Sequence, residues 1–314
     1  MRLQLRTIVG FVAAGSILSA TANAAVINVP ADFATIDAAI NVAACGDEIV
    51  VAPGTYNEPI NFMGKAITLR SSDGPDVTTI DGTALNVPVV RCVNGEGPST
   101  VLRGFSITGA DIKNGGAPRG MLNLNSSPTI SHCIFHHNLG GDGAGMLNDN
   151  SNPWIENCTF SDNSVTVGIA RHGAGMENGN NSNPTVISCT FSGNIVSGGG
   201  SNIGGGMTNL GGSNPLVTNC TFRDNIADEG AAMWNSPTSL PTVAASSFCQ
   251  NLPDDDIFGR WTDGGGNVFG MCRSADLTGP DGVPDGCVDS ADLTLLLGAW
   301  CSVAGGNPCG TCFP

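Results

Sequence analysis

The C-terminal segment carries the side chains best suited to binding a metal ion. Residues 281–292 read DGVPDGCVDSAD, with aspartates at loop positions 1, 5, 9 and 12 and a glycine at position 6. This spacing matches a twelve-residue EF-hand loop, in which carboxylates and one backbone carbonyl bind calcium. The predicted calcium ligands are four aspartate carboxylates and one cysteine carbonyl, from Asp281, Asp285, Cys287, Asp289 and Asp292.

Two positions of this loop depart from the pattern. Val283 stands where an aspartate or asparagine is expected, and Asp292 stands where a longer glutamate usually binds through both oxygens. The alternative interpretation is therefore an acidic turn that binds no metal. The apolar run Leu293–Trp300 follows as the predicted exit helix.

A second set of residues suited to chemistry lies in loops. Asp142 lies in GGDG, and Arg171 and His172 lie in the insertion VTVGIARHG. Arginine, histidine and carboxylate side chains can orient a carbohydrate by hydrogen bonds, so these three are the candidates for a carbohydrate site and weaker candidates for catalysis. A glycosidase needs two facing carboxylates and a lyase needs a basic proton acceptor, and the surrounding sequence has few of either.

These loops interrupt a repeat that covers residues 128–251. A phrase that starts with proline and ends in Phe-x-x-Asn occurs five times, beginning at Pro128, Pro153, Pro184, Pro215 and Pro241. A second phrase, Met-x-Asn after a glycine or alanine, precedes each one, with Met121, Met146, Met176, Met207 and Met233. Self-similarity at a period of roughly 20–50 residues indicates a repeat architecture. The candidate loops all fall between one Phe-x-x-Asn and the next Met phrase, so we expect them to project from one side.

The repeat predicts an all-β fold, a right-handed parallel β-helix. Its segments are short, β-branched and bounded by Gly, Asn, Asp or Pro. Val186 and Cys189 can both face inward only if the chain bends around Ile187–Ser188. Three short strands per coil, stacked about 4.8 Å apart, then bury a continuous core. Leucine-rich repeats and propellers are disfavoured, because leucine is scarce and the repeat is too short for a four-stranded blade.

Identical residues recur at fixed places in the repeat. Methionine and phenylalanine columns are expected to fill the core, and Cys133, Cys158, Cys189 and Cys220 to be buried free thiols rather than a metal ladder, since Ser246 replaces the fifth. The asparagines form either an amide ladder between coils or a row that binds sugar. His136 and His137 are expected to be exposed turn residues.

The two ends of the chain differ from the repeat. Arg2 and Arg6, an apolar stretch and Ala22-Asn23-Ala24 predict a signal peptide over residues 1–24, cleaved after Ala24, with no membrane span. We expect a helix over Asp32–Ala44, capped by Asp32, to cover the open end of the solenoid.

The cysteines outside the core column predict disulfides, because an exported chain can oxidise them. Six of them lie at or beyond residue 249: Cys249, Cys272, Cys287, Cys301, Cys309 and Cys312. They can form up to three disulfides in fifteen possible ways. Cys45 and Cys92 either pair or stay free. The predicted domains are thus the β-helix over residues 25–270 and a small calcium-binding, disulfide-rich module over residues 271–314.

Several phrases resemble known families. The glycine-rich Met phrase followed by Phe-x-x-Asn resembles the repeat of polymorphic outer-membrane proteins, and ADFATIDAAI, GDEIVVAPGTY and GKAITLRS resemble the start of pectin methylesterases. Both resemblances imply the pectin-lyase-like β-helix fold over about residues 26–270. DGCVDSADLTLLLGAW resembles half of a dockerin. The fold hosts enzymes and non-catalytic adhesins alike, and no match to the catalytic segments of pectin methylesterases is found.

The charge balance restricts the partners. The formal charge is −15, and removal of the two leader arginines makes it −17. Such a surface disfavours nucleic acid and anionic lipid. We expect a secreted or cell-surface protein, leaning to a non-catalytic role, that binds a polysaccharide or a surface protein. The alternatives are a pectate-lyase-like polysaccharide-active enzyme and a purely structural envelope protein.

Overall fold

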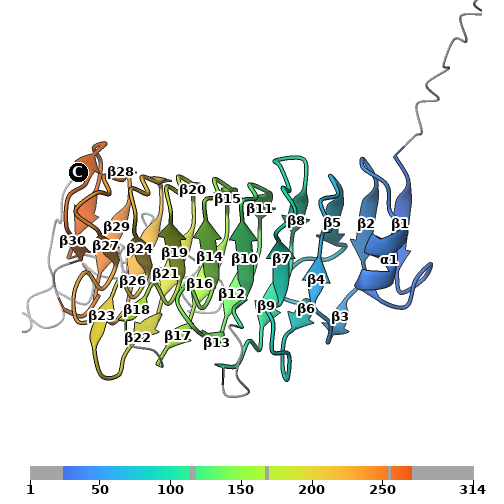
Figure 1. Ribbon diagram of the computed structural model, residues 1–314, viewed down its shortest axis with the longest axis horizontal. Coiled ribbons are helices and arrows are strands. Elements are labelled where there is room, and N and C mark those ends of the chain that lie inside the picture. Colours follow the sequence, from blue (N-terminus) through green and yellow to red (C-terminus); the bar gives the residue numbers. More distant parts are fainter. Residues whose placement is uncertain (1–23, 113–117, 167–169, 254–255, 271–314) are drawn as a thin grey trace, which may run out of the picture.

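The computed structural model describes residues 24–112, 118–166, 170–253 and 256–270. Over these ranges the chain winds into a right-handed parallel β-helix with one α-helix at its N-terminal end (Figure 1). Each long-sheet strand pairs in parallel with its equivalent in the neighbouring coil, as the repeat predicts. The fold expected from the sequence is confirmed. The calcium-loop and tail residues lie outside the described ranges.

Three long sheets form the sides of the solenoid. The ten-stranded sheet contains β1 (Val26–Val29), β2 (Glu48–Val51), β5 (Thr68–Ser71), β8 (Val101–Arg103), β11 (Thr129–Ser131), β15 (Trp154–Glu156), β20 (Thr185–Ile187), β25 (Leu216–Thr218), β28 (Thr242–Ala244) and β31 (Thr262–Asp263). The nine-stranded sheet contains β3 (Gly54–Tyr56), β6 (Thr78–Asp81), β9 (Ser106–Thr108), β12 (Ile134–His136), β16 (Thr159–Ser161), β21 (Thr190–Ser192), β26 (Thr221–Arg223), β29 (Ser247–Cys249) and β32 (Val268–Phe269). The eight-stranded sheet contains β4 (Ile60–Asn61), β7 (Val90–Cys92), β10 (Met121–Leu124), β14 (Met146–Asp149), β19 (Met176–Gly179), β24 (Met207–Asn209), β27 (Met233–Asn235) and β30 (Ile257–Phe258).

The predicted bend between two strands of a coil is present. Ser188 has a φ of 52°, in the left-handed region, between β20 and β21. His132, Asn157, Asn219 and Ala245 occupy the equivalent position with a positive φ as well. The bend turns the chain so that Val186 before it and Cys189 after it both face the core, and both are buried.

The interior consists of columns of identical side chains. Phe191 stacks on Phe160 with ring centroids 4.8 Å apart and on Phe222 at 4.6 Å, with nearly parallel planes. The methionines of the five Met phrases are fully buried. Parallel in-register strands place each side chain over its equivalent one coil away, so a column buries apolar surface continuously.

The thiols of the core column are buried and free, as predicted. The backbone N–H of Cys189 donates to Cys220 Sγ at 3.4 Å, and that of Cys220 donates to Ser246 Oγ at 3.0 Å. The hydroxyl of Ser246 therefore takes over the contact made by sulfur in the other coils. Cys45 and Cys92 stay free: the first is exposed and the second is buried.

Both asparagine columns form buried amide ladders. In the first, Asn148 Nδ2 donates to Asn178 Oδ1 at 2.8 Å, and Asn178 Nδ2 donates to Asn209 Oδ1 at 2.9 Å. In the second, Asn194 Nδ2 donates to Asn225 Oδ1 in one neighbouring coil and to the Phe160 carbonyl in the other. Because these amides are buried and bonded to one another, the ladder interpretation holds and a sugar-binding role for these columns does not.

The N-terminal helix starts later than the sequence suggested. It spans α1 (Ile36–Val42), and Thr35 is its N-cap, with Thr35 Oγ1 accepting from Ala38 N. Asp32 instead accepts hydrogen bonds from the backbone and side chain of Asn28. The carboxylate of Glu58 accepts hydrogen bonds from the first two helical N–H groups, those of Ile36 and Asp37, and so completes the cap. The helix packs on β1, β2 and β4 at the N-terminal end of the core, where a cap was expected.

Two short sheets project beside the solenoid. The first contains β13 (Leu139–Gly140), β17 (Ser164–Val165) and β22 (Ile195–Val196), and the second contains β18 (Ala170–His172) and β23 (Ser201–Ile203). They lie between the nine-stranded sheet and the eight-stranded sheet in chain order and extend to one side of the solenoid (Figure 1). We call these segments the arms. The expectation that the repeat-breaking loops share one side is thus confirmed.

Candidate functional site

One acidic residue interrupts the outer face of the eight-stranded sheet. Along this face the residues between the core methionine and the ladder asparagine lie in register, as Leu122, Leu147, Glu177, Thr208 and Trp234. Their neighbours on both sides point into the core, so these side chains point outward. Glu177 is nevertheless only 8 % exposed. Something outside the sheet must therefore cover this carboxyl group.

The end of the arm strand β18 lies over it, with His172 Nδ1 3.9 Å from Glu177 Oε2. The arms also bury a second apolar cluster of small side chains: Ala144, Val165, Ala174, Val196, Ala227 and Ala231. Gly173 directly follows β18 and has a φ of +53°. A Cβ at this position would lie 2.3 Å from the Met176 carbonyl oxygen. The tight turn at Gly173 brings the end of β18 close to β19, and with it His172 close to Glu177.

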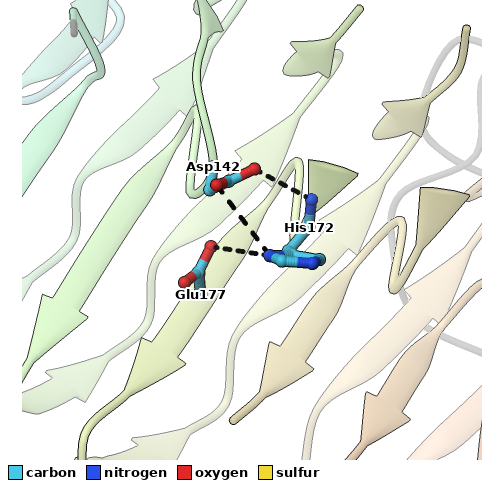
Figure 2. A group of neighbouring side chains, drawn as sticks. All are labelled: Asp142, His172 and Glu177. Atoms are coloured by element: carbon cyan, nitrogen blue, oxygen red, sulfur yellow. Dashed lines mark hydrogen bonds and ion pairs between the residues drawn. The ribbon is translucent and has the colours of Figure 1, made fainter. Parts of the chain in front are cut away.

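Three side chains meet beneath the arms (Figure 2). Asp142 comes from the loop between β13 and β14, His172 from the end of β18, and Glu177 from β19. His172 Nδ1 lies 3.9 Å from Asp142 Oδ2 and 3.9 Å from Glu177 Oε2. One donor atom from each residue lies within 4.8 Å of the other two. The backbone N–H of His172 donates to Asp142 Oδ1 at 3.1 Å, which fixes this carboxylate against β18.

Burial shifts the protonation of this cluster. It raises the pKa of Glu177 to about 8, and the charges of Asp142 and Asp149 act in the same direction. Burial also lowers the pKa of His172, against the opposing charge of Asp142. Near neutral pH, Glu177 is therefore protonated and His172 is neutral. Arg119 is the nearby positive charge, and burial lowers its pKa as well, against the effect of these carboxylates.

The cluster lacks the geometry of a sugar-cleaving pair. Two glycosidase carboxyl groups stand about 5–5.5 Å or about 6.5–9.5 Å apart, on either side of a bound glycosidic bond. Here the carboxylate oxygens of Asp142 and Glu177 come within 4.8 Å, and Glu177 is covered by the arms. With Glu177 only 8 % exposed, a sugar chain cannot reach it in this arrangement. The arrangement suits a small ligand or a structural role.

The structure brings together two of the three residues selected from the sequence. Asp142 and His172 are in contact, while Arg171 lies on β18, where it pairs with Asn202 of β23. The sequence analysis missed Glu177, because it sits inside the regular Met phrase, and Arg119, because it precedes the first of them. The sequence did hold one signal for Glu177: it is the acidic residue at a repeat position where the other four Met phrases have Leu122, Leu147, Thr208 and Trp234. The predicted calcium ligands lie outside the described residues.

A serine–histidine pair lies on the nine-stranded sheet. Ser106 Oγ lies 2.7 Å from His136 Nε2, and His136 Nδ1 lies 2.8 Å from His137 Nδ1. Hydrolytic triads need a carboxylate that orients the imidazole, and within the described ranges His137 occupies that place instead. Ser106 is also only 6 % exposed. The prediction that both histidines are exposed turn residues is wrong for His136, which is a half-buried strand residue that closes over the serine.

The outer face of the ten-stranded sheet presents a fixed aromatic ring. Trp154 is 44 % exposed, and its indole Nε1 donates to Glu156 Oε2 at 3.2 Å. In the neighbouring coils Thr129 and Thr185 stand in register with it, and Leu216 follows, 43 % exposed. The hydrogen bond holds the ring in one orientation between the two flanking threonines.

A row of exposed amides borders this face at the preceding turn. The backbone N–H of Asn183 donates to Asn152 Oδ1 at 2.6 Å, and that of Asn214 donates to Asn183 Oδ1 at 2.7 Å. All three asparagines are exposed. Polar groups thus recur once per coil beside Trp154.

A family model for the right-handed β-helix region matches residues 60–208 and 91–251. The chain belongs to this family. Among solved structures, it is similar to the pectin methylesterase from Aspergillus niger, with a TM-score of 0.52 and 11 % identity over 79 % of this chain and 87 % of that one. It is also similar to the carrot pectin methylesterase, with a TM-score of 0.45 and 12 % identity over 93 % and 99 % of the two chains. At such identities the likeness shows the fold alone.

No curated protein matches the sequence. Within the described residues, no helix has the length and apolar character needed to cross a membrane.

Proposed function

We propose that this β-helix is an exported, non-catalytic protein that binds a neutral polysaccharide along the outer face of its ten-stranded sheet. The observation that carries the proposal is Trp154, an exposed indole held by Glu156 beside rows of threonine and asparagine side chains. An indole offers a large apolar face at little cost in conformational entropy, and hydroxyls and amides beside it can bond to sugar hydroxyls.

Charge favours a neutral chain over a uronate-rich one. The formal charge of the protein is −15, so an acidic polysaccharide meets net repulsion at low ionic strength. Apart from Glu156, which holds the indole, the polar groups beside Trp154 are threonine hydroxyls and asparagine amides, which carry no charge. A neutral glycan can bond to them without this repulsion.

A regular surface also suits a regular ligand. The exposed amides of Asn152, Asn183 and Asn214 recur once per coil, at a strand spacing of about 4.8 Å, and threonines flank Trp154 in the coils on both sides. A polysaccharide laid along the solenoid meets an amide again in each of these coils. Several weak contacts of this kind add up because they are linked through one ligand.

The test is affinity electrophoresis of the mature protein in gels containing neutral polysaccharides, compared with gels containing pectate. We expect retardation by at least one neutral polysaccharide and quenching of tryptophan fluorescence on binding. Trp154→Ala should abolish both effects. Trp234→Ala is the matched control, because this indole lies on the eight-stranded sheet, where it donates to Glu229 and stacks with Phe258. Equal loss in both variants would contradict the assignment of this face.

A polysaccharide-active enzyme is the second candidate. The observation in its favour is the buried Glu177, whose pKa burial raises to about 8, since a general acid must keep its proton near neutral pH. Catalysis at this site would require the arms to open. Release of reducing ends or of unsaturated uronate from a panel of polysaccharides, lost in Glu177→Gln, would favour this candidate over the first.

The export signal and the calcium-binding tail complete the proposal. A secreted β-helix with a calcium-stabilised module fits a recognition protein of the cell surface or its surroundings. Mass spectrometry of the exported protein should give an N-terminus at Ala25. Calorimetry with calcium, repeated on Asp285→Ala, tests the predicted loop. An unprocessed N-terminus or calcium binding unchanged by Asp285→Ala would contradict these two parts separately.

A further inference from the structure

The Asp142–His172–Glu177 cluster has an arrangement that the polysaccharide proposal does not use. Each residue comes from a different segment, and each points a donor atom toward the same space beneath the arms (Figure 2). We propose that these three side chains bind a first-row divalent transition-metal ion, with Zn²⁺ as the reference ion. This site is separate from the predicted calcium loop and from the sheet that carries Trp154.

The spacing of the donor atoms fits such an ion after a small adjustment. Zinc bonds of about 2.0–2.1 Å to nitrogen and oxygen place tetrahedral ligands about 3.4 Å apart. His172 Nδ1 lies 3.9 Å from an oxygen of each carboxylate. The carboxylate oxygens of Asp142 and Glu177 come within 4.8 Å of each other, so the ion would also draw these two side chains together.

The orientation of one ligand is already fixed by a second hydrogen bond. Asp142 uses Oδ1 to accept from the backbone N–H of His172, which leaves Oδ2 facing the imidazole. Bonds of this kind commonly orient metal ligands in proteins. The same residue, His172, thus supplies one donor atom and positions another.

Glu177 provides an independent observation. Its residue surface is 8 % exposed, and its Oε2 is buried without a hydrogen-bond partner. A buried polar atom of this kind costs about 1–3 kcal/mol unless something satisfies it. Glu177 Oε2 is the atom that faces His172 Nδ1, so a cation between them would satisfy it.

The donor set selects the class of ion. One imidazole with two carboxylates suits zinc, iron, manganese or cobalt, whereas calcium prefers six to eight oxygen ligands. Once the ion has displaced the proton of Glu177, the two carboxylates balance the charge of a dication. The positive charge of nearby Arg119 opposes the cation. Its Nε is buried without a hydrogen-bond partner, and the guanidinium acts on the carboxylates through its charge.

The ion would link parts of the chain that the β-ladder does not connect. Asp142 belongs to one coil, and His172 and Glu177 to the next, where they lie on an arm strand and on the eight-stranded sheet. Binding would therefore fasten the arm to the solenoid. We expect metal to protect the end of β18 and the turn after it, residues 170–174, from proteolysis.

The experiment uses the mature protein with Cys45→Ser, which removes the exposed thiol, in buffer saturated with calcium so that the tail is filled. Zinc calorimetry should give one site per chain. Cobalt should give visible absorption bands typical of nitrogen and oxygen ligands, without the thiolate charge-transfer band. His172→Ala, Asp142→Asn and Glu177→Gln should each weaken zinc binding at least about 10-fold.

Two control variants separate this site from general effects. His132→Ala removes a histidine at a repeat position where the fifth repeat has Ala245. Asp162→Asn removes a carboxylate at the repeat position that His137 occupies one coil earlier. Both should bind zinc like the parent protein, and circular dichroism should show all variants folded. No zinc binding by the parent protein, or binding that the three ligand variants leave unchanged, would overturn the proposal. Neither result affects the test of Trp154.

Discussion

Three consecutive residues of β19 show two environments within one strand. Met176 and Asn178 face the interior, where five successive coils repeat the same residue, and Glu177 faces outward, where the paired strands have Leu147 and Thr208. All three are buried, but for different reasons. The first two are buried by the coils above and below, and the third lies beneath the end of the arm strand that carries His172. Repetition therefore builds the solenoid, and departure from repetition builds the site.

The largest effect is expected in the phenylalanine column. Phe191→Ala removes a fully buried ring that stacks on two neighbours, so it should cost about 3–5 kcal/mol of unfolding free energy. Urea-induced unfolding followed by circular dichroism measures this loss. A change below about 1 kcal/mol would show that the column is not the main source of stability, and the comparison between interior and arms would fail.

The pH dependence of stability should distinguish Glu177 from the interior. Below about pH 4.5 the carboxyl is protonated in both the folded and the unfolded chain. Its pKa is about 8 in the folded chain against an ordinary value of 4.5, so between these values only the unfolded chain releases the proton. Stability thus falls as the pH rises through this window, by roughly 2–4 kcal/mol.

Urea unfolding at about pH 5 and about pH 8.5, with a chelator present to keep metal out, tests this prediction. Glu177→Gln cannot ionise and should lack the decrease, whereas Asp162→Asn should retain it. Parallel stability curves for the parent protein and Glu177→Gln would mean that the arms do not desolvate the carboxyl group.

A smaller effect is expected in the amide ladder. Asn194 Nδ2 donates to the Phe160 carbonyl and to Asn225 Oδ1, and its Oδ1 accepts from Asn163. Asn194→Ala leaves these buried groups unpaired and should cost about 2–3 kcal/mol. The exposed Asn183→Ala should cost less than about 1 kcal/mol, because water replaces its bonds. Equal losses would remove the distinction between buried and exposed asparagine rows.

The smallest effect is expected in the thiol column. Cys189→Ser should cost less than about 1 kcal/mol, because Ser246 fills the same position and accepts the same backbone hydrogen bond. Thermal unfolding of the variant measures the change. A loss as large as that of Phe191→Ala would show that sulfur itself is needed in the interior.

Most of the fold could be predicted because each coil repeats the same constraints. The inward Val, Cys and Phe positions required a bend near Ile187–Ser188, and the positive φ of Ser188 provides it. The start of the helix could not be predicted, because the cap depends on Glu58 from a later coil. Local sequence favours both Asp32 and Thr35 as caps, and only the tertiary contact decides between them.

The site could be predicted only in part. Asp142 and His172 stand out because they interrupt the repeat, and their loops must leave the solenoid on the same side. Glu177 does not stand out, because its burial depends on how the arms fold back over the sheet. Nothing in the spacing of the Met phrase carries that information. The raised pKa of Glu177 could not be predicted either, because it results from the same burial.

The register of the ladders has an evolutionary consequence. Residues 184–214 form one complete coil of 31 residues, whose buried Cys, Phe, Met and Asn side chains lie beside the same residue types in both neighbouring coils. Duplication or loss of such a unit leaves these core contacts in place, because each coil touches only its neighbours. Gene duplication can therefore change the length of this solenoid freely. Glu177 and its partners occur in one pair of coils, so they mark the part of the molecule that such events must leave intact.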